Sequence, residues 1–169
     1  MNSKFLSIDE LKKLNFKKIG SEIKISRNVT IIGEENISLG SNVRIDDYCI
    51  ISSNEGYLKI GNDVHIGGQS YLGCAGDLTI GNNINIAQGV KIYTKINDYT
   101  SFDGNNNKFI LGKIDIGDQV IIGSNSVLIG KCIIGEGATI GALSFVKNDL
   151  KPWSVYAGNP LKFIKDRQS

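Results

Sequence analysis

An aliphatic residue recurs at every sixth position over most of this chain. Eighteen positions fall into six triplets whose members are six residues apart, namely Ile19/Ile25/Ile31, Leu39/Ile45/Ile51, Ile60/Ile66/Leu72, Ile80/Ile86/Ile92, Ile116/Ile122/Leu128 and Ile134/Ile140/Val146. Glycine often follows the aliphatic residue, and a small or apolar residue often stands four positions after it. Self-similarity at a fixed period indicates a repeat protein whose stacked units share one core.

Three hexads predict one triangular coil of about 18 residues. In such a coil each aliphatic side chain points inward and stacks on the same position one coil later, while strands of successive coils pair in parallel at about 4.8 Å. No coil buries its own aliphatic residues, so stability comes from its neighbours. The gaps between the triplets are 8, 9, 8, 24 and 6 residues, which places the additional residues at one corner of the coil.

The pattern therefore predicts an all-β chain. A parallel β-helix of about six to seven coils fills residues 17–150. Residues 1–16 hold a short cap helix, because Ser7-Ile8-Asp9-Glu10 is a capping-box pattern. Such covers are expected, because an open end of a repeat protein exposes strand edges or apolar core.

Two segments interrupt or follow the repeat. The longest gap predicts a protruding loop of about residues 95–112, and loops of that length are usually functional or disordered. Residues 151–169 form a C-terminal extension, in which Asn159 and Pro160 predict the start of a second short helix.

Composition narrows the class of protein. With 20 Gly but only 2 Pro in 169 residues the chain is not collagen, and with 41% hydrophobic residues and a net charge of +2 it is not a disordered chain. That mild charge gives no reason to expect nucleic acid as a partner. Charges interrupt the N-terminal segment and no apolar run is long enough for a membrane span, so we expect a cytoplasmic location. Cys49, Cys74 and Cys132 have no CxxC spacing, which argues against a disulfide framework or a zinc site.

The hexads over residues 19–146, followed by the tail PWSVYAGNPLK from Pro152 to Lys162, resemble the hexapeptide-repeat acyltransferases. The tail is similar to the branch that includes maltose, galactoside and nodulation-factor O-acetyltransferases and surface-polysaccharide acetyltransferases. The resemblance covers almost the whole chain. It implies a left-handed parallel β-helix, acetyl-CoA as the acyl donor with no metal, and a homotrimer with active sites between subunits. It also implies an acceptor hydroxyl or amine on a sugar, a sugar nucleotide or a polysaccharide unit, in surface-polysaccharide biosynthesis.

The base that this resemblance implies is absent from its expected position. In the family a catalytic His follows the strand before the long loop, in a stretch like Tyr-Thr-x-x-His-Asp-Tyr. The corresponding stretch from Tyr93 to Tyr99 reads YTKINDY, so Asn97 stands at the His position. A general base must accept a proton near neutral pH, and an Asn side chain does not.

The chain has one histidine, His65. Its side chain is expected to point outward, because the next residue is an inward aliphatic position, and Arg44 and Asn85 are its expected neighbours on the adjacent coils. We hypothesise that His65 is the base and lies opposite Asn97 and Asp98 of a neighbouring subunit, where Asp98 orients the imidazole.

Three other interpretations of these residues stay open. His65 is an outward side chain without chemistry, or Asp98 is itself the base, which requires a raised pKa. Alternatively the acceptor is an amine that is already partly neutral, and positioning alone provides much of the rate gain. The missing loop His favours such an amine acceptor.

The resemblance also places the donor. In the family the pantetheine arm of CoA lies in the groove between two prisms, against backbone groups of the last coils. The matching positions are Gly123, Ser124, Gly141, Ala142, Lys147 and Asn148. Lys162 and its basic neighbours in the tail suit the phosphates of CoA.

Other functions occur among proteins with this kind of repeat. A γ-type carbonic anhydrase shares the helix but needs three His ligands for zinc, and this chain has one His. A catalytically impaired relative that serves as a binding or scaffold module is favoured by Asn97 alone.

Overall fold

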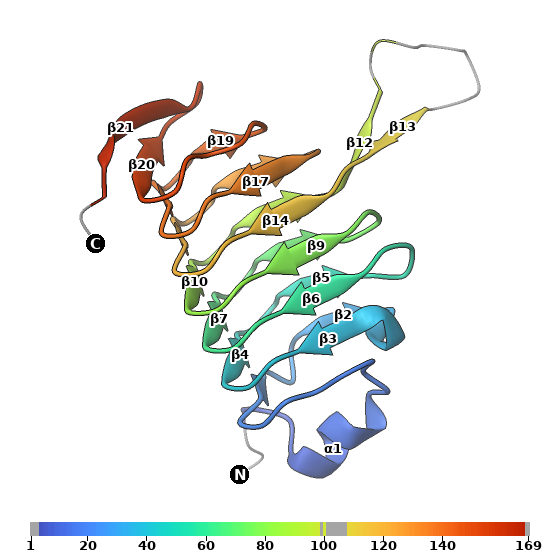
Figure 1. The fold of residues 1–169 in the computed structure, drawn as a ribbon. Helices are drawn as coiled ribbons and strands as arrows, with labels where there is room; N and C mark the ends of the chain where they lie inside the picture. Colours follow the sequence, from blue (N-terminus) through green and yellow to red (C-terminus); the bar gives the residue numbers. More distant parts are fainter. Residues whose placement is uncertain (1–3, 99, 101–107, 168–169) are drawn as a thin grey trace.

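The computed structural model describes residues 4–98, 100 and 108–167, and in it the repeat forms a triangular prism of stacked coils (Figure 1). Each coil contributes one short strand to each of three sheets, and strands of successive coils pair in parallel with inner aliphatic residues in register. The predicted β-helix is therefore confirmed.

The three faces of the prism are three sheets. The first sheet has eight strands: β1 (Lys24–Ile25), β4 (Val43–Ile45), β7 (Val64–Ile66), β10 (Ile84–Ile86), β15 (Ile121–Ile122), β18 (Thr139–Ile140), β20 (Ser154–Ala157) and β21 (Lys162–Asp166). The second has six: β2 (Thr30–Ile32), β5 (Ile50–Ser52), β8 (Tyr71–Gly73), β11 (Lys91–Tyr93), β16 (Val127–Ile129) and β19 (Phe145–Val146). The third has five: β3 (Ile37–Leu39), β6 (Leu58–Ile60), β9 (Leu78–Ile80), β14 (Ile114–Ile116) and β17 (Cys132–Ile134).

The inner aliphatic residues form one continuous core. From the second triplet onward all of the predicted positions are buried, with at most 2% of each residue exposed. The first coil differs, because Ile19 is 38% exposed and Ile31 is only partly buried. This coil has a neighbour on one side only. On the other side lies the short helix α1 (Ile8–Lys13), which buries Leu11.

The predicted capping box of α1 is present. Glu10 N donates to Ser7 Oγ at 3.3 Å, and Ser7 N donates to Glu10 Oε2 at 2.7 Å. The Glu10 carboxylate also accepts two hydrogen bonds from Arg27 of the first coil. These bonds to the carboxylate lower the pKa of Glu10 to about 2. The cap helix is thus attached to the prism by a charge pair as well as by Leu11.

The chain turns at three corners, which we name by their residues. The asparagine corner joins the third sheet to the first and follows Leu39, Ile60, Ile80, Ile116 and Ile134. The glycine corner joins the first sheet to the second and follows Ile45, Ile66, Ile86, Ile122 and Ile140. The loop corner joins the second sheet to the third and has segments of unequal length. At the first two corners the third residue after the aliphatic position has a positive φ, as in Asn42, Gln69 and Gly89, which is a conformation that Asn and Gly tolerate well.

A ladder of side chains runs along the asparagine corner. Ser41 N donates to Asn62 Oδ1 at 2.8 Å, Asn62 N donates to Asn82 Oδ1 at 2.8 Å, and Asn82 N donates to Asp118 Oδ1 at 2.7 Å. The ladder ends at Asp118, since Glu136 of the next coil contacts Gln119 instead. Each side chain therefore satisfies the turn amide of the preceding coil, which the coil itself leaves unpaired.

The loop corner carries the predicted protrusion. An antiparallel hairpin of β12 (Lys95–Asn97) and β13 (Phe109–Leu111) forms its base, while residues 99 and 101–107 lie outside the described part of the chain (Figure 1). Buried Thr94 fixes the start of the hairpin, because its Oγ1 donates to Gly73 O at 2.9 Å and accepts from Gly76 N at 2.8 Å.

The predicted C-terminal helix is wrong. The segment after Pro160 is the strand β21, which pairs antiparallel with β20 at the end of the first sheet. Phe163 packs edge-on against Tyr156 of β20, with ring centroids 5.7 Å apart. Pairing with the last open strand supplies hydrogen bonds that an isolated helix of this length does not gain in water. The extension therefore closes the prism by adding a strand.

No helix among the described residues has the length and apolar composition needed to cross a membrane. Within the same residues there is no group of three or more His, Cys, Asp or Glu side chains placed to hold a metal ion.

Candidate active site

His65 lies at the centre of β7 on the outer side of the first sheet. The alternation of the strand buries Val64 and Ile66 and turns His65 outward, with 42% of its side chain exposed. Arg44 of β4 and Asn85 of β10 are its partners in register. The orientation and both neighbours are as the repeat predicts.

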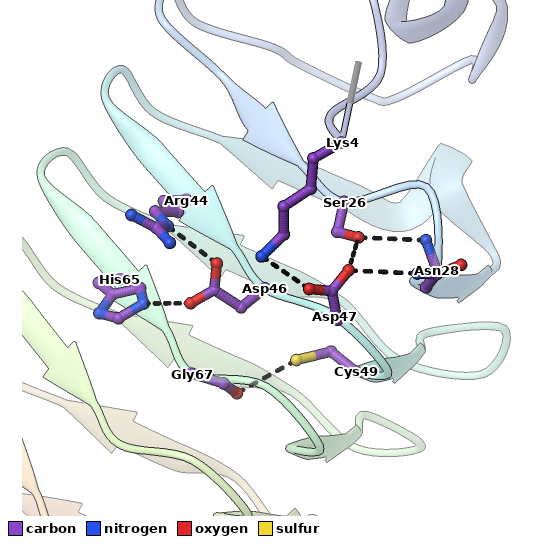
Figure 2. Close-up of polar contacts among 9 residues, drawn as sticks. All are labelled: Lys4, Ser26, Asn28, Arg44, Asp46, Asp47, Cys49, His65 and Gly67. Carbon is purple, nitrogen blue, oxygen red and sulfur yellow. Dashed lines mark hydrogen bonds and ion pairs between the residues drawn. The ribbon is translucent and has the colours of Figure 1, made fainter. Parts of the chain in front are cut away.

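Asp46 is the nearest charged partner of His65, and sequence reasoning missed it. His65 Nε2 lies 2.8 Å from Asp46 Oδ2, and Arg44 Nε donates to Asp46 Oδ1 at 2.8 Å (Figure 2). Partial burial raises the pKa of Asp46, but the hydrogen bonds from His65 and Arg44 outweigh burial and lower it. Asp46 is therefore a carboxylate at neutral pH. The sequence contains the information for this contact. Asp46 directly follows Ile45, the inner residue in register with Ile66, so Asp46 lies on the coil next to His65.

The second nitrogen of His65 also faces an oxygen. Nδ1 lies 3.2 Å from Asn85 Oδ1. Two oxygen acceptors suit an imidazolium, in which both ring nitrogens donate. When the ring is neutral and Nε2–H donates to Asp46, Nδ1 is a proton acceptor. Asn85 is exposed, so its side chain has room to turn or to give way to a ligand.

The neighbouring carboxylate, Asp47, has a structural role. Asp47 Oδ2 lies 2.7 Å from Lys4 Nζ, and its Oδ1 accepts hydrogen bonds from Ser26 Oγ and Asn28 Nδ2 (Figure 2). These bonds lower the pKa of Asp47 to about 2. Asp47 therefore attaches the N-terminal segment to the glycine corner, and it is already engaged on both oxygens.

The three thiols are not nucleophiles. Cys49, Cys74 and Cys132 are fully buried, and burial raises the pKa of each. The pKa of Cys74 rises to about 12 and that of Cys132 to about 11. Since the thiolate is the reactive form, burial leaves these three side chains as part of the core.

A row of unpaired backbone amides runs along the glycine corner. They belong to the second residue of each turn: Asp47, Gly68, Gln88, Ser124 and Ala142. Within the described part of the chain none of these five amides donates a hydrogen bond, whereas the next amide of each turn donates to the preceding coil. Successive coils are about 4.8 Å apart, so the row spans roughly 19 Å and passes the coil that carries His65.

Four of the residues expected to bind the donor, Gly123, Ser124, Gly141 and Ala142, lie at the glycine corner on the last full coils. Ser124 and Ala142 belong to the row of unpaired amides, and Gly123 and Gly141 directly precede them. A Cβ at Gly123 would lie 2.4 Å from Ala142 N, so only glycine fits there.

The remaining predicted donor residues lie on different elements. Lys162 of β21 is in register with Ala157, which leads into the end of the glycine corner. Lys147 and Asn148 instead follow β19, at the loop corner. Arg167 lies at the asparagine corner, where its guanidinium donates to two backbone carbonyls.

Asn97 and Asp98 are not near His65 within one chain. Asn97 ends β12 at the loop corner, across the second sheet from the glycine corner, and its side chain is exposed. Asp98 Oδ1 accepts hydrogen bonds from Thr100 N at 2.9 Å and Thr100 Oγ1 at 2.6 Å, so Asp98 stabilises a turn of the hairpin. The intramolecular structure therefore pairs the imidazole with Asp46.

Comparison with known proteins agrees with this architecture. Residues 113–148 match the family model "Bacterial transferase hexapeptide (six repeats)". Over 171 aligned positions the chain is 39% identical to an Escherichia coli dTDP-4-amino-4,6-dideoxy-D-glucose acyltransferase, covering 96% of this chain and 88% of that protein.

Solved structures of AntD, an N-acyltransferase from Bacillus cereus, resemble the whole chain. The complex of AntD with dTDP and 3-hydroxybutyryl-CoA has a TM-score of 0.91 at 33% identity and covers 99% of this chain and 92% of AntD. A single-residue variant of AntD bound to dTDP-4-amino-4,6-dideoxyglucose and coenzyme A has a TM-score of 0.92 at 33% identity, covering 100% and 93%. The chain is therefore a left-handed β-helix and belongs to the hexapeptide-repeat acyltransferase family.

Proposed function

We propose that this enzyme transfers an acyl group from a CoA thioester to the amine of a dTDP-4-amino-4,6-dideoxyhexose. The observation that carries the proposal is the row of free amides that leads to the coil of His65. It is supported by the similarity to a dTDP-4-amino-4,6-dideoxy-D-glucose acyltransferase and to an AntD variant that binds dTDP-4-amino-4,6-dideoxyglucose. Acetyl-CoA is the proposed donor, because the tail from Ala157 to Lys162 resembles the acetyl-CoA branch. We place the reaction in the cytoplasm and in surface-polysaccharide biosynthesis, as the family resemblance implies.

The glycine corner gives the donor a direction. Lys162 at the C-terminal end provides positive charge for the phosphates of CoA. The free amides of Ala142, Ser124 and Gln88 are donors for the two amide carbonyls of the pantetheine arm. An arm laid along this row brings its thioester to Gly68, three residues after His65.

His65 accepts the proton that the amine loses when it attacks the thioester carbon. Attack forms the new C–N bond and a tetrahedral oxyanion, and collapse of that intermediate breaks the C–S bond and releases CoA thiolate. Asp46 holds Nε2–H, so Nδ1 is the accepting atom, and the resulting imidazolium has oxygen partners in Asp46 and Asn85. The same proton then passes to the thiolate.

A trimer completes the site. The outer face of the second sheet is largely apolar, and its outward residues away from the loop-corner tyrosines include Ile32, Ile50, Val127, Ile129 and Phe145. The central outward residues of the third sheet are mostly polar: Ser38, Lys59, Thr79, Asp115 and Ile133. We place the second sheet against the three-fold axis, because apolar surface is favoured in subunit contacts.

This packing brings two different corners together. When triangular prisms turn the same face to a three-fold axis, each glycine corner lies beside the loop corner of the next subunit. His65 then faces Asn97 and Asp98 of a neighbour, and the acceptor binds between them.

A thiol-release assay tests the proposal. With acetyl-CoA and dTDP-4-amino-4,6-dideoxyglucose, the wild type should release CoA, and His65→Ala should lower kcat by roughly 100-fold or more. Lys24→Ala is the matched control, because Lys24 is an outward residue of the same column two coils away. Unchanged turnover in His65→Ala would remove His65 from the mechanism.

Asn97 favours one other function, a binding module that has lost catalysis. Such a protein would bind CoA and release no thiol with amino or hydroxyl sugar nucleotides. Turnover with the amino sugar nucleotide excludes it, and turnover with a hydroxyl sugar alone would exclude the amine acceptor.

A further inference from the structure

A pocket of about 290 Å³ lies at the loop corner, between the corner segments and the base of the hairpin. It is separate from the groove of the glycine corner in the same chain. Its floor is formed by β8 and β11 of the second sheet, and its rim by β12 and β13. The segments at the loop corner differ in length from coil to coil, so the pocket is formed by these particular segments and not by the repeat.

The floor of the pocket is aromatic. The rings of Tyr71 and Tyr93 lie with centroids 5.1 Å apart and planes tilted by 33°. Gly73 makes this arrangement possible, since a Cβ at that position would lie 2.7 Å from the ring of Tyr71. Tyr71 therefore lies along the sheet and reaches Tyr93, which gives a broad ring surface that is only partly buried.

The wall of the pocket presents amides and one neutralised charge pair. Asn54 on a corner segment and Asn97 on the hairpin both line it. In the described part of the chain the Asn97 side chain makes no hydrogen bond. Lys95 Nζ lies 3.0 Å from Glu55 Oε2 and 4.5 Å from the centroid of Phe109, so the wall carries no net charge from this pair.

We propose that this pocket binds the pyrimidine base of the sugar nucleotide. The inference rests on the proposed function, which supplies the nucleotide. A flat base stacks on Tyr71 and Tyr93, because every base offers a ring face to an aromatic side chain. An Asn side chain has one acceptor and two donors, and these complement the N3–H and C4=O groups of thymine. The neutralised pair of Lys95 and Glu55 suits an uncharged ring better than a phosphate.

This assignment also gives Asn97 a function. A residue that recognises the base needs a donor and an acceptor on one group, which an amide has at every pH. The base is then held by one subunit, and the sugar extends across the cleft toward His65 of the next. Asn97 therefore acts in binding, and this role does not require a side chain that accepts a proton.

Binding of dTDP alone tests the stacking surface, with isothermal calorimetry as the readout. Tyr93→Leu should weaken dTDP roughly tenfold or more, while Tyr93→Phe keeps the ring and should bind as the wild type does. Tyr57→Leu is the matched control, since Tyr57 is an exposed tyrosine near the same corner that contacts Lys17 outside the pocket. CoA affinity should be unchanged in all three variants, which also checks their folding. Equal dTDP affinity in Tyr93→Leu and the wild type would overturn the proposal.

Asn97→Ala tests the amide. The substitution lies at an exposed position and should weaken dTDP several-fold while CoA affinity stays unchanged. Wild-type dTDP affinity in this variant would contradict the role of Asn97.

The two proposals fail in different ways. If dTDP binding depends on Tyr93 but no thiol is released, the acyl transfer is wrong and the base pocket stands. If thiol is released and Tyr93→Leu leaves the KM for the sugar nucleotide unchanged, the pocket is wrong and the acyl transfer stands.

Discussion

The asparagine and glycine corners have the same backbone and different chemistry. At both corners the chain leaves an inner aliphatic residue, passes through two residues, and turns at a residue with positive φ, as at Asn83 and Gln69. At the asparagine corner the second residue carries a side-chain oxygen that accepts the turn amide of the preceding coil. At the glycine corner the same position is Gly68, Gln88, Ser124 or Ala142, or Asp47 in the first of these turns, whose oxygens bind side chains instead. The turn amides of this corner have no acceptor in the described chain.

The difference shows how a repeat gains a binding groove without a change of fold. A ladder of asparagine side chains satisfies the amides of its corner internally and contributes stability. The glycine corner gives up those hydrogen bonds, so its amides are free to bind a long ligand that runs parallel to the prism axis. Gly67 and Gly123 also leave the amides of the next coil uncovered, since a Cβ at either position would lie 2.6 Å from Gln88 N or 2.4 Å from Ala142 N.

Converting one corner into the other should have the largest effect. The double variant S124N/A142N puts asparagine where the glycine corner lacks it, and each new side chain should accept the amide of the preceding coil as Asn82 Oδ1 accepts Asn62 N. CoA would then lose two hydrogen bonds from the backbone, each worth about 0.5–1.5 kcal/mol. This loss should weaken the binding of CoA by roughly 5- to 150-fold. Calorimetric titration with CoA measures the loss.

S124A is the control for this double variant, because it adds no oxygen that reaches an amide. It should bind CoA within about a factor of two of the wild type. The unfolding free energy of S124N/A142N should equal or exceed that of the wild type. Wild-type CoA affinity in the double variant would mean that the free amides do not hold the cofactor.

The reverse change should have a smaller effect, and on stability alone. Asn82→Ala leaves the amide of Asn62 without its acceptor and removes the bonds to Asp118, which should lower the unfolding free energy by about 1–2 kcal/mol. Gln88→Ala, at the equivalent position of the glycine corner, removes no such bond. It should change the unfolding free energy by less than about 0.5 kcal/mol. Urea unfolding of the two variants makes the comparison. Equal losses in both would show that the ladder does not stabilise its corner.

Most of the fold follows from the sequence, because the six-residue period dictates which side chains are buried. Ile66 and Ile122 occupy inner positions as expected, and the outward direction of His65 follows from its place before Ile66. The six-residue period predicts nothing after Val146, where the repeat ends. The segment from Lys162 to Asp166 has the local signals of a helix start, but the open edge of β20 decides its structure, and local signals carry no information on that edge.

The site was less predictable than the fold, for two physical reasons. Asp46 lies 19 residues before His65 and reaches it only because successive coils are in register, so the pair depends on the length of each coil. Asn97 and His65 belong to different corners, and their meeting depends on a second subunit. The free amides were more accessible to sequence reasoning, since Gly68 and Ser124 stand where the other corner has Asn62 and Asp118.

The smallest predicted effect concerns the N-terminal end of the glycine corner, where Asp47 binds Lys4 and Ser26. These contacts lower the pKa of Asp47 in the folded chain to about 2, below its ordinary value of 3.8. A depressed carboxyl pKa contributes stability that is fully present above the ordinary value and is lost as the pH falls toward the folded value. The thermal midpoint of the wild type should therefore decrease slightly between about pH 4 and pH 2, beyond the decrease caused by other carboxylates.

Asp47→Asn should remove that part of the slope, since the amide does not titrate, and it should leave the midpoint at pH 2 close to that of the wild type. Glu10→Gln is the useful comparison, because Glu10 has a similarly lowered pKa through Arg27 at the cap helix. The partners of the two carboxylates are connected, since Arg27 N donates to Lys4 O at 3.1 Å. A loss of slope in the double variant that differs from the sum of the two single losses would therefore measure coupling between the two sites. A slope that is unchanged in Asp47→Asn would show that the N-terminal segment contributes nothing to the stability of the glycine corner, and the corner would then depend on its backbone pairing alone.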